Sequence, residues 1–225
     1  MKNKIILQSR NWQKDLKYCE MIKDRGIAAY SGMLGFNIPK YAEKSVKENG
    51  SFKWIDMCCG YFDAGRDLTY NLFQNRKNDV ISKIETIGVD ADTFMGDSSV
   101  RVGMKAKVHR GNAVDYVLPE KVDLVTCLRG LRYIEEYLGQ GALAIQNWFN
   151  QLPQNGILLF DTYYNNGGPK EHEDNPVIAG NIELTKALVQ RLGNSVKTYR
   201  TNYRGINSFV VKIKKQKPEG INLFD

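Results

Sequence analysis

The chain has 225 residues, of which 42% are apolar and 25% are charged, a balance typical of one soluble globular domain. The apolar run at residues 5–7 is too short for a signal peptide, and no stretch approaches the roughly 18–20 apolar residues of a membrane span. We therefore expect a single cytoplasmic domain over residues 1–225, with no membrane segment.

The formal net charge of +7 is the second property that limits the possible functions. Basic residues concentrate mildly between 197 and 217, where they form either solvated faces or a patch for nucleic acid or an anionic substrate. The four cysteines show no C-x-x-C spacing, which favours a reduced protein without a metal site.

Helix-like and strand-like runs alternate along the chain. The pattern predicts helices over 10–25, 39–48, 63–75, 133–151 and 182–192, and strands over 53–57, 84–90, 105–109, 122–128, 157–161, 195–202 and 208–214. Residues 26–37, which hold three glycines among apolar residues, are expected to form a flexible hinge, and 163–181 a loop. We expect an α/β fold with a seven-stranded, mostly parallel sheet, helices on both faces and an antiparallel C-terminal strand.

Residues 52–68 carry the most informative pattern. An apolar strand ends in Asp56, passes through the small-residue turn Cys58-Cys59-Gly60 and re-enters a helical pattern at Ala64. α/β proteins bind nucleotide-like ligands where a strand turns onto a helix N-terminus in this way. The spacing Gly-x-Gly-x-x-Gly of dinucleotide-binding proteins is absent, and a carboxylate before the turn suits a ligand with an amino or hydroxyl group.

Five segments in this order resemble the motifs of class I S-adenosylmethionine-dependent methyltransferases. They are Trp54-Ile-Asp-Met-Cys-Cys-Gly-Tyr-Phe62, the strand-ending Asp90, Gly111-Asn-Ala113, Val122-Asp-Leu-Val125 and Leu152-Pro-Gln-Asn-Gly156. The resemblance covers about residues 50–162. It implies a Rossmann-like core over 51–225, preceded by N-terminal lid helices within 1–50.

The resemblance also implies S-adenosylmethionine as the cofactor. Asp56 would lie under its methionine end and attract the ammonium group, while the amides around Gly60 would face the methionine portion. Asp90 would accept hydrogen bonds from the ribose hydroxyls, and Asn112 would meet the adenine amine. An ordinary turn or capping role is the alternative for each of these polar side chains. The remaining implied cofactor contacts are Cys58, Cys59, Ala113 and Leu128.

Two residues of the turn depart from the family pattern. Cys58 stands in place of its first glycine and Phe62 in place of its third. Glycine allows close approach of the backbone to a ligand, or a positive φ. Phe62 must therefore either point away from the cofactor or cover it.

Three residues are candidates for the reaction itself. Arg129, just after the fourth strand, either clamps an anionic acceptor or forms a salt bridge at a helix start. His172, in the expected loop, is either a general base or a solvated histidine. Tyr30 either lines the acceptor pocket or belongs to the core.

The resemblance implies methyl transfer to the O or N of a small-molecule acceptor, as in small-molecule biosynthesis, by a monomer or homodimer. The N-terminal helices and the 163–181 loop would cover the acceptor. The first alternative is a non-catalytic S-adenosylmethionine-binding relative that acts as a regulatory or complex-forming subunit. The second is an RNA methyltransferase, which rests on charge alone because no separate nucleic-acid-binding module is visible.

Overall fold

The computed structural model describes residues 26–60, 62–91, 105–131, 134–135, 139–163, 176–217 and 222–223. The helix expected at 10–25, the loop residues 164–175 and the candidate base His172 lie outside these residues.

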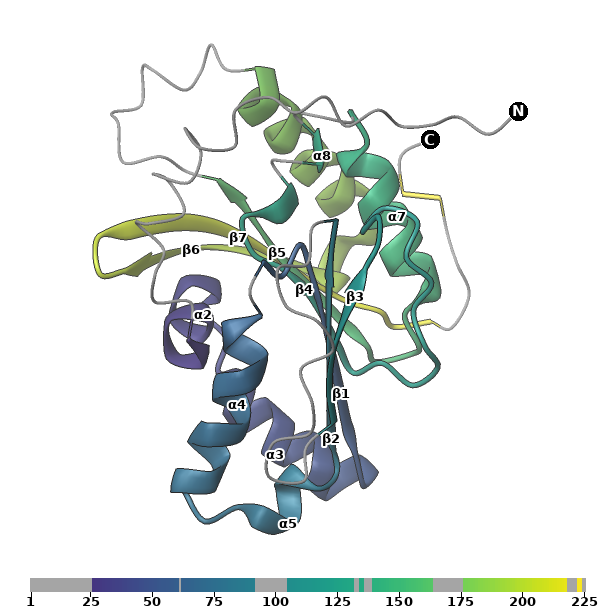
Figure 1. Cartoon of the computed structure of the whole chain (residues 1–225). Coiled ribbons are helices and arrows are strands. Elements are labelled where there is room, and N and C mark those ends of the chain that lie inside the picture. Colours follow the sequence, from purple (N-terminus) through teal and green to yellow (C-terminus); the bar gives the residue numbers. More distant parts are fainter. Residues whose placement is uncertain are drawn as a thin grey trace.

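The described residues form a seven-stranded sheet in the order β3-β2-β1-β4-β5-β7-β6 (Figure 1). The strands are β1 (Phe52–Met57), β2 (Ile84–Asp90), β3 (Lys105–Arg110), β4 (Leu124–Cys127), β5 (Ile157–Tyr163), β6 (Val196–Tyr203) and β7 (Ile206–Lys214). The first five run parallel, and β7 is antiparallel to both β5 and β6. The predicted sheet is thereby confirmed, including its antiparallel C-terminal edge.

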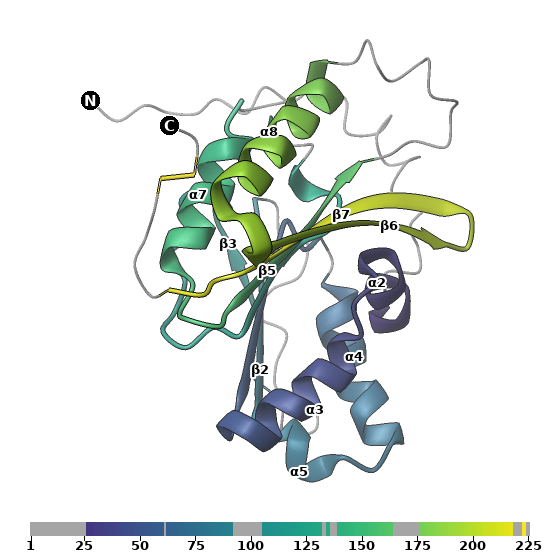
Figure 2. The same ribbon diagram turned by 180° about the vertical axis from the view of Figure 1, so that it is seen from behind.

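Helices cover both faces of the sheet, as the two opposite views show (Figures 1 and 2). One layer consists of α2 (Ile27–Leu34), α3 (Ile38–Asn49), α4 (Asp63–Gln74) and the short α5 (Asn78–Ile81). The other consists of α7 (Gly141–Gln151) and α8 (Pro176–Leu192). Each layer has its own hydrophobic core, so the central strands are buried on both sides, as parallel strands in α/β proteins usually are. No helix among the described residues has the length and apolar character needed to span a membrane.

Two helix boundaries differ from the sequence prediction. The helix expected at 133–151 is α7, which begins at Gly141, because Gly139 adopts a left-handed conformation and the Glu135 carboxylate accepts from the Gly141 amide at 2.7 Å. The helix expected at 182–192 is α8, which begins at Pro176. Proline suits the first turn of a helix because its missing N–H would have no helical partner there.

The flexible hinge expected at 26–37 is wrong. Most of this segment is the helix α2, and its apolar side chains are buried in the core. The glycines serve close packing: a Cβ on Gly32 would lie 2.2 Å from the Tyr203 ring, and one on Gly35 would lie 2.7 Å from Thr201. Tyr199 and Thr201 of β6 also donate hydrogen bonds to the last carbonyls of α2. The sequence pattern of small and apolar residues therefore marks a helix pressed against the sheet.

This packing predicts that α2 contributes to the stability of the whole domain. Leu34 is fully buried, so Leu34→Ala should lower the free energy of unfolding by about 2–5 kcal/mol, the usual range for a buried leucine. Leu143 on α7 is 46% exposed and provides a matched control, for which the same substitution should change stability by less than about 0.5 kcal/mol. Urea denaturation of both variants measures the difference, and equal effects would contradict the packing of α2.

Candidate functional site

The candidate site lies at the carboxyl ends of the parallel strands, where the chain passes from β1 to α4. The Gly60 amide donates a hydrogen bond to Oδ2 of Asp90 at 2.8 Å, and the Cys59 amide donates to the Val89 carbonyl at 3.1 Å. These bonds hold the turn after β1 against the end of β2. The turn and the strand-ending acid, which the sequence placed in the same site, are therefore in direct contact.

Three of the described residues of the turn have a positive φ, and two of them are not glycine. The φ values are 57° at Cys58, 56° at Gly60 and 54° at Phe62. Left-handed backbone is uncommon outside glycine and costs about 1–3 kcal/mol when a non-glycine residue is held in it. The residues that replace glycine thus keep the backbone conformation that glycine would adopt.

Phe62 points into the interior, away from the surface of the turn. Its side chain is 1% exposed, and its ring lies 6.0 Å from that of Trp54. A Cβ on Gly65 of α4 would lie 2.3 Å from the ring, and a Cβ on Gly88 of β2 would lie 2.9 Å from it. These two glycines therefore make room for Phe62 between the helix and the sheet. Sequence reasoning missed their role, although glycines inside a helix and a strand were the available signal.

Asp56 is a buried carboxylate at the end of β1. It is 1% exposed, and its Oδ1 accepts hydrogen bonds from the Tyr30 hydroxyl and, at 2.8 Å, from Thr126 of β4. Thr126 in turn accepts a hydrogen bond from the indole of Trp54 at 2.8 Å. Of the two interpretations of Tyr30, the structure supports a core residue, because only 3% of it is exposed and its hydroxyl binds Asp56.

The bond between Tyr30 and Asp56 predicts a pH-dependent contribution to stability. Burial, and then the negative charge of Asp56, raise the pKa of Tyr30 well above its ordinary value. The folded protein therefore keeps the phenol proton at pH values where the unfolded chain loses it. The stabilisation is fully present below about pH 10, the ordinary tyrosine pKa, and is lost as the pH rises beyond it.

Tyr30→Phe should accordingly lower the free energy of unfolding by about 1.5–3 kcal/mol near pH 8, the range for hydrogen bonds to charged groups. The gap between wild type and variant should narrow as the pH is raised above about 10. Tyr70 is 61% exposed, so Tyr70→Phe is the matched control and should show neither effect. Denaturation across this pH range tests both points, and a gap independent of pH would contradict the assignment.

Arg129 forms an ion pair inside the fold. Its Nε lies 3.2 Å from Oδ2 of Asp161 on β5, and its backbone amide donates to Oδ1 of the same carboxylate at 2.6 Å. Its Nη2 donates to the Ser208 hydroxyl of β7 at 3.1 Å, and the residue is only 9% exposed. Of the two interpretations of Arg129, the structure thus supports the salt bridge, which joins the end of β4 to β5 and β7.

The loop after β3 lies beside the end of β2. The Gly111 amide donates to the Asp90 carbonyl at 2.9 Å, which places the next residue, Asn112, near the acid. The Asn112 side chain accepts from the Val114 amide and donates to Asp115, both at 3.0 Å, so in this state it stabilises its own turn. Ala113 and Leu128 are buried, and Asp90 and Asn112 are partly exposed.

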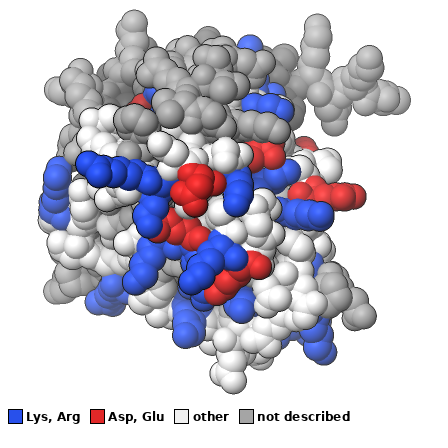
Figure 3. Space-filling view, turned by 90° about the horizontal axis from the view of Figure 1, so that it is seen from below, with Lys and Arg blue, Asp and Glu red and all other residues white. Residues whose placement is uncertain are grey.

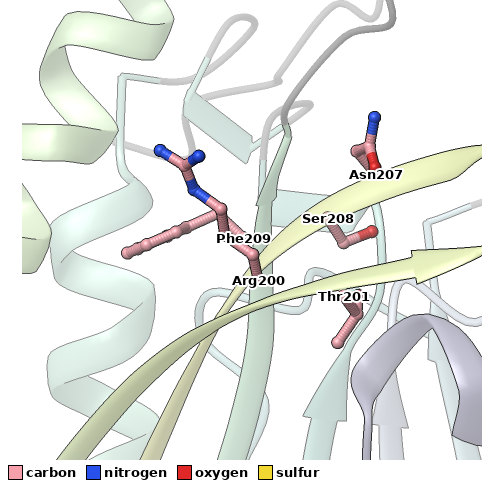
Figure 4. A pocket seen from close by; sticks show the side chains of 5 residues that line it. All are labelled: Arg200, Thr201, Asn207, Ser208 and Phe209. Atoms are coloured by element: carbon pink, nitrogen blue, oxygen red, sulfur yellow. The ribbon is translucent and has the colours of Figure 1, made fainter.

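A small cavity of about 170 Å³ lies on the hairpin of β6 and β7 (Figure 4). It is lined by Arg200, Thr201, Asn207, Ser208 and Phe209. Arg200 and Phe209 are cross-strand partners that project from the same side of the hairpin, whereas Thr201 projects from the other. Ser208 pairs with Tyr163 at the end of β5, so the cavity lies at the same edge of the sheet as the turn.

The described lysines of the β6–β7 hairpin lie away from this end of the sheet, whereas Arg200 lines the cavity. On the face seen from below, basic and acidic side chains are interleaved (Figure 3). Of the basic residues on the hairpin, Lys197 and Lys212 are cross-strand partners, and Lys214 pairs with Ile157 at the start of β5, opposite to the candidate site. Lys215 is buried, and its ammonium group donates to two carbonyls at the end of α7.

No protein-family model matches the sequence, and no curated protein matches it significantly. Solved structures do match the fold. One is the plantazolicin methyltransferase BpumL in complex with S-adenosyl-L-homocysteine (SAH). Its sequence is 8% identical to this chain, and the two structures match with a TM-score of 0.59 over 92% of each chain. The plantazolicin methyltransferase BamL, in complex with a triazolic desmethylPZN analog and SAH, is 14% identical, with a TM-score of 0.55 over 91% of this chain and 90% of its own.

The N-methyltransferase NodS from Bradyrhizobium japonicum WM9, in complex with SAH, is 12% identical, with a TM-score of 0.51 over 92% of this chain and 100% of its own. The protein therefore has the fold of class I S-adenosylmethionine-dependent methyltransferases, as the sequence predicted. At these identities the likeness establishes the fold, and the activity must be argued from the site.

Proposed function

We propose that the protein is an S-adenosylmethionine-dependent methyltransferase that acts on the O or N of a small-molecule acceptor. The observation that carries the proposal is the contact between the Gly60 amide and the Asp90 carboxylate at 2.8 Å. It brings the turn after β1 and the acid that ends β2 together at the carboxyl ends of adjacent parallel strands, which is where open α/β sheets bind nucleotides.

The residues present at this edge fit the proposed cofactor. Phe62, which stands in place of the third glycine, is turned into the core and does not cover the turn. The amides around Gly60 would face the methionine portion. Asp90 would bind the ribose hydroxyls and Asn112 the adenine, with the remaining contacts from Cys58, Cys59, Ala113 and Leu128. Asp56 would act on the ammonium group through its charge from beneath the turn, since its Oδ1 is taken up by Tyr30 and Thr126.

The cofactor would supply the methyl group on a sulfonium centre. The protein's own contribution is then to position the acceptor in line with that centre and to exclude water. Arg129 contributes indirectly, because its ion pair with Asp161 holds the ends of β4 and β5 together. The cavity on the β6–β7 hairpin is the proposed acceptor side. The likeness to NodS, an N-methyltransferase, and to the plantazolicin methyltransferases BpumL and BamL supports an acceptor other than nucleic acid.

Two alternatives remain testable beside this proposal. The non-glycine residues Cys58 and Phe62 in the turn favour a non-catalytic cofactor-binding subunit, because they are the departures from the family pattern. RNA methylation rests on charge alone: the hairpin lysines lie toward the start of β5, away from the candidate site, whereas Arg200 lines the cavity. The free thiols of Cys58, Cys59 and Cys127 fit a reducing, cytoplasmic location.

Calorimetry with SAH and S-adenosylmethionine tests the cofactor, and a screen of small-molecule acceptors with methyl-labelled cofactor tests the reaction. Binding together with labelled product supports the enzyme. Binding without any labelled product would support the non-catalytic alternative. Absence of binding to either compound would overturn the proposal.

Asp90→Ala should weaken SAH binding by about 1.5–3 kcal/mol, the range for losing hydrogen bonds to a charged acceptor. The fold should survive because Asp90 ends its strand and is partly exposed. Asp79, which is exposed on α5, gives the matched control, and Asp79→Ala should bind SAH like wild type. Unchanged affinity in the Asp90 variant would rule out the ribose assignment.

A further inference from the structure

Two thiols, one in the proposed cofactor turn and one at the end of a neighbouring strand, lie close together. Cys58 follows β1, and Cys127 is the last residue of β4, the strand that pairs with β1 through Asp56 and Thr126. Their sulfur atoms lie on either side of one small space next to Gly130. Both sulfur atoms lie 2.8 Å from the point that a Cβ on Gly130 would occupy, so the missing side chain of Gly130 is what leaves room for the pair.

The third cysteine of the site does not belong to this pair. The Cys59 thiol donates to the Gly60 carbonyl at 3.5 Å, and a Cβ on Gly88 of β2 would lie 2.7 Å from its sulfur. Cys59 therefore packs toward β2, in a cluster with Phe62 and Val108. The thiol that shares the space beside Gly130 with Cys58 is that of Cys127.

We propose that Cys58 and Cys127 form an intramolecular disulfide when the protein meets a peroxide, and that this bond inactivates the cofactor turn. The first part, the formation of the disulfide, is inferred only from the proximity of the two thiols. The second part rests on the proposed function.

The exposures of the two thiols set the order of the steps. Cys58 is partly exposed and Cys127 is fully buried, so the peroxide meets Cys58 first. The Cys58 sulfur attacks one peroxide oxygen, the O–O bond breaks, and the products are a sulfenic acid and water. The Cys127 sulfur then attacks the Cys58 sulfur, the S–O bond breaks, and a second water leaves with the Cys127 proton. The two thiols lose two electrons and two protons in total, and the peroxide is reduced to two waters.

Cys127 does not take part in the first step. The hydrogen bond with the Cys58 thiol, then burial, raise the pKa of Cys127 well above its ordinary value. Cys127 therefore stays protonated and does not react with the peroxide itself. In a reducing compartment such a bond is transient and reversible by thiol exchange.

The bond would disturb the turn because a disulfide brings two sulfurs to about 2.05 Å, closer than any non-bonded contact. β4 lies at the centre of the sheet, so the adjustment falls on the turn after β1. Cys58 already has a φ of 57°, and Gly60, two residues on, makes the hydrogen bond to Asp90. Pulling Cys58 toward β4 would move the amides that the methionine portion requires away from Asp90.

The test uses the reduced full-length protein. It is treated with a small excess of hydrogen peroxide, the remaining thiols are alkylated, and the digest is mapped by mass spectrometry. We expect a cross-linked peptide pair that contains Cys58 and Cys127 and has lost two hydrogens. SAH affinity, measured by calorimetry, should fall at least tenfold on oxidation and return after treatment with dithiothreitol.

Cys127→Ala provides the matched variant, because Cys127 is not among the proposed cofactor contacts. In reduced form it should bind SAH like wild type, and after peroxide it should carry a dimedone adduct on Cys58 and no cross-link. The map of the wild-type protein does not depend on how this variant folds. A bond from Cys58 to Cys59, or oxidation of Cys58 without any cross-link, would overturn the proposal.

Cross-linked protein that binds SAH with unchanged affinity would overturn the second part alone. Reduced protein that binds neither SAH nor S-adenosylmethionine would count against the proposed function, while the disulfide map would still decide the first part.

Discussion

The buried carboxylate of Asp56 is the constraint on which the rest of the structure depends. A carboxylate at 1% exposure must be hydrogen bonded, because leaving a charged group unpaired in the interior is strongly unfavourable. Its partners come from three separate parts of the chain: Tyr30 from α2, Thr126 from β4 and, through Thr126, the indole of Trp54 in β1. The helix α2 is therefore part of the support of the site, since removing it would take away the hydrogen bond from the Tyr30 hydroxyl to Asp56.

A second constraint is the position of the glycines, which lie on the elements around the turn where the family pattern has them in the turn itself. The family pattern places glycine where Cys58 and Phe62 stand, so that no side chain needs space there. Here the side chains are present and the space is provided opposite them: Gly65 and Gly88 face the Phe62 ring, and Gly130 faces Cys58. The turn keeps its left-handed backbone at both positions. Glycine is thus still required at this site, but on the neighbouring elements.

The sequence predicted the sheet well because its central strands carry short apolar runs, such as Trp54-Ile55 in β1, Leu124-Val125 in β4 and residues 157–160 in β5. The hinge at 26–37 was wrong because glycine was taken as a sign of flexibility, whereas Gly32 and Gly35 permit contact with β6, a partner more than 160 residues away in the chain. No local pattern reveals such a contact.

The same limit applies to the site. The contact of the turn with Asp90 follows from strand order and was predictable, because adjacent parallel strands present their ends together. The burial of Tyr30 against Asp56 and the meeting of Cys58 with Cys127 depend on which face each side chain takes. That is settled only when both core layers are assembled around the sheet.

The strand order also explains why so many of these features meet in one place. The chain builds β1, β2 and β3 outward in one direction and then returns to add β4 on the other side of β1. The crevice at this reversal is where open α/β sheets bind their ligands. Asp56, Cys58, Thr126, Cys127 and Arg129 all lie on the two strands that flank the reversal or on the residues directly after them.

The elements around the reversal also contact the β6–β7 edge of the sheet. Arg129 reaches Ser208 of β7 through its guanidinium group, and α2 reaches β6 through the carbonyls of its last turn. The turn proposed for the cofactor and the hairpin that carries the cavity are therefore held by the same rigid elements. Groups held in this way need little reorganisation when a ligand binds, which is the property that positioning of two reactants requires.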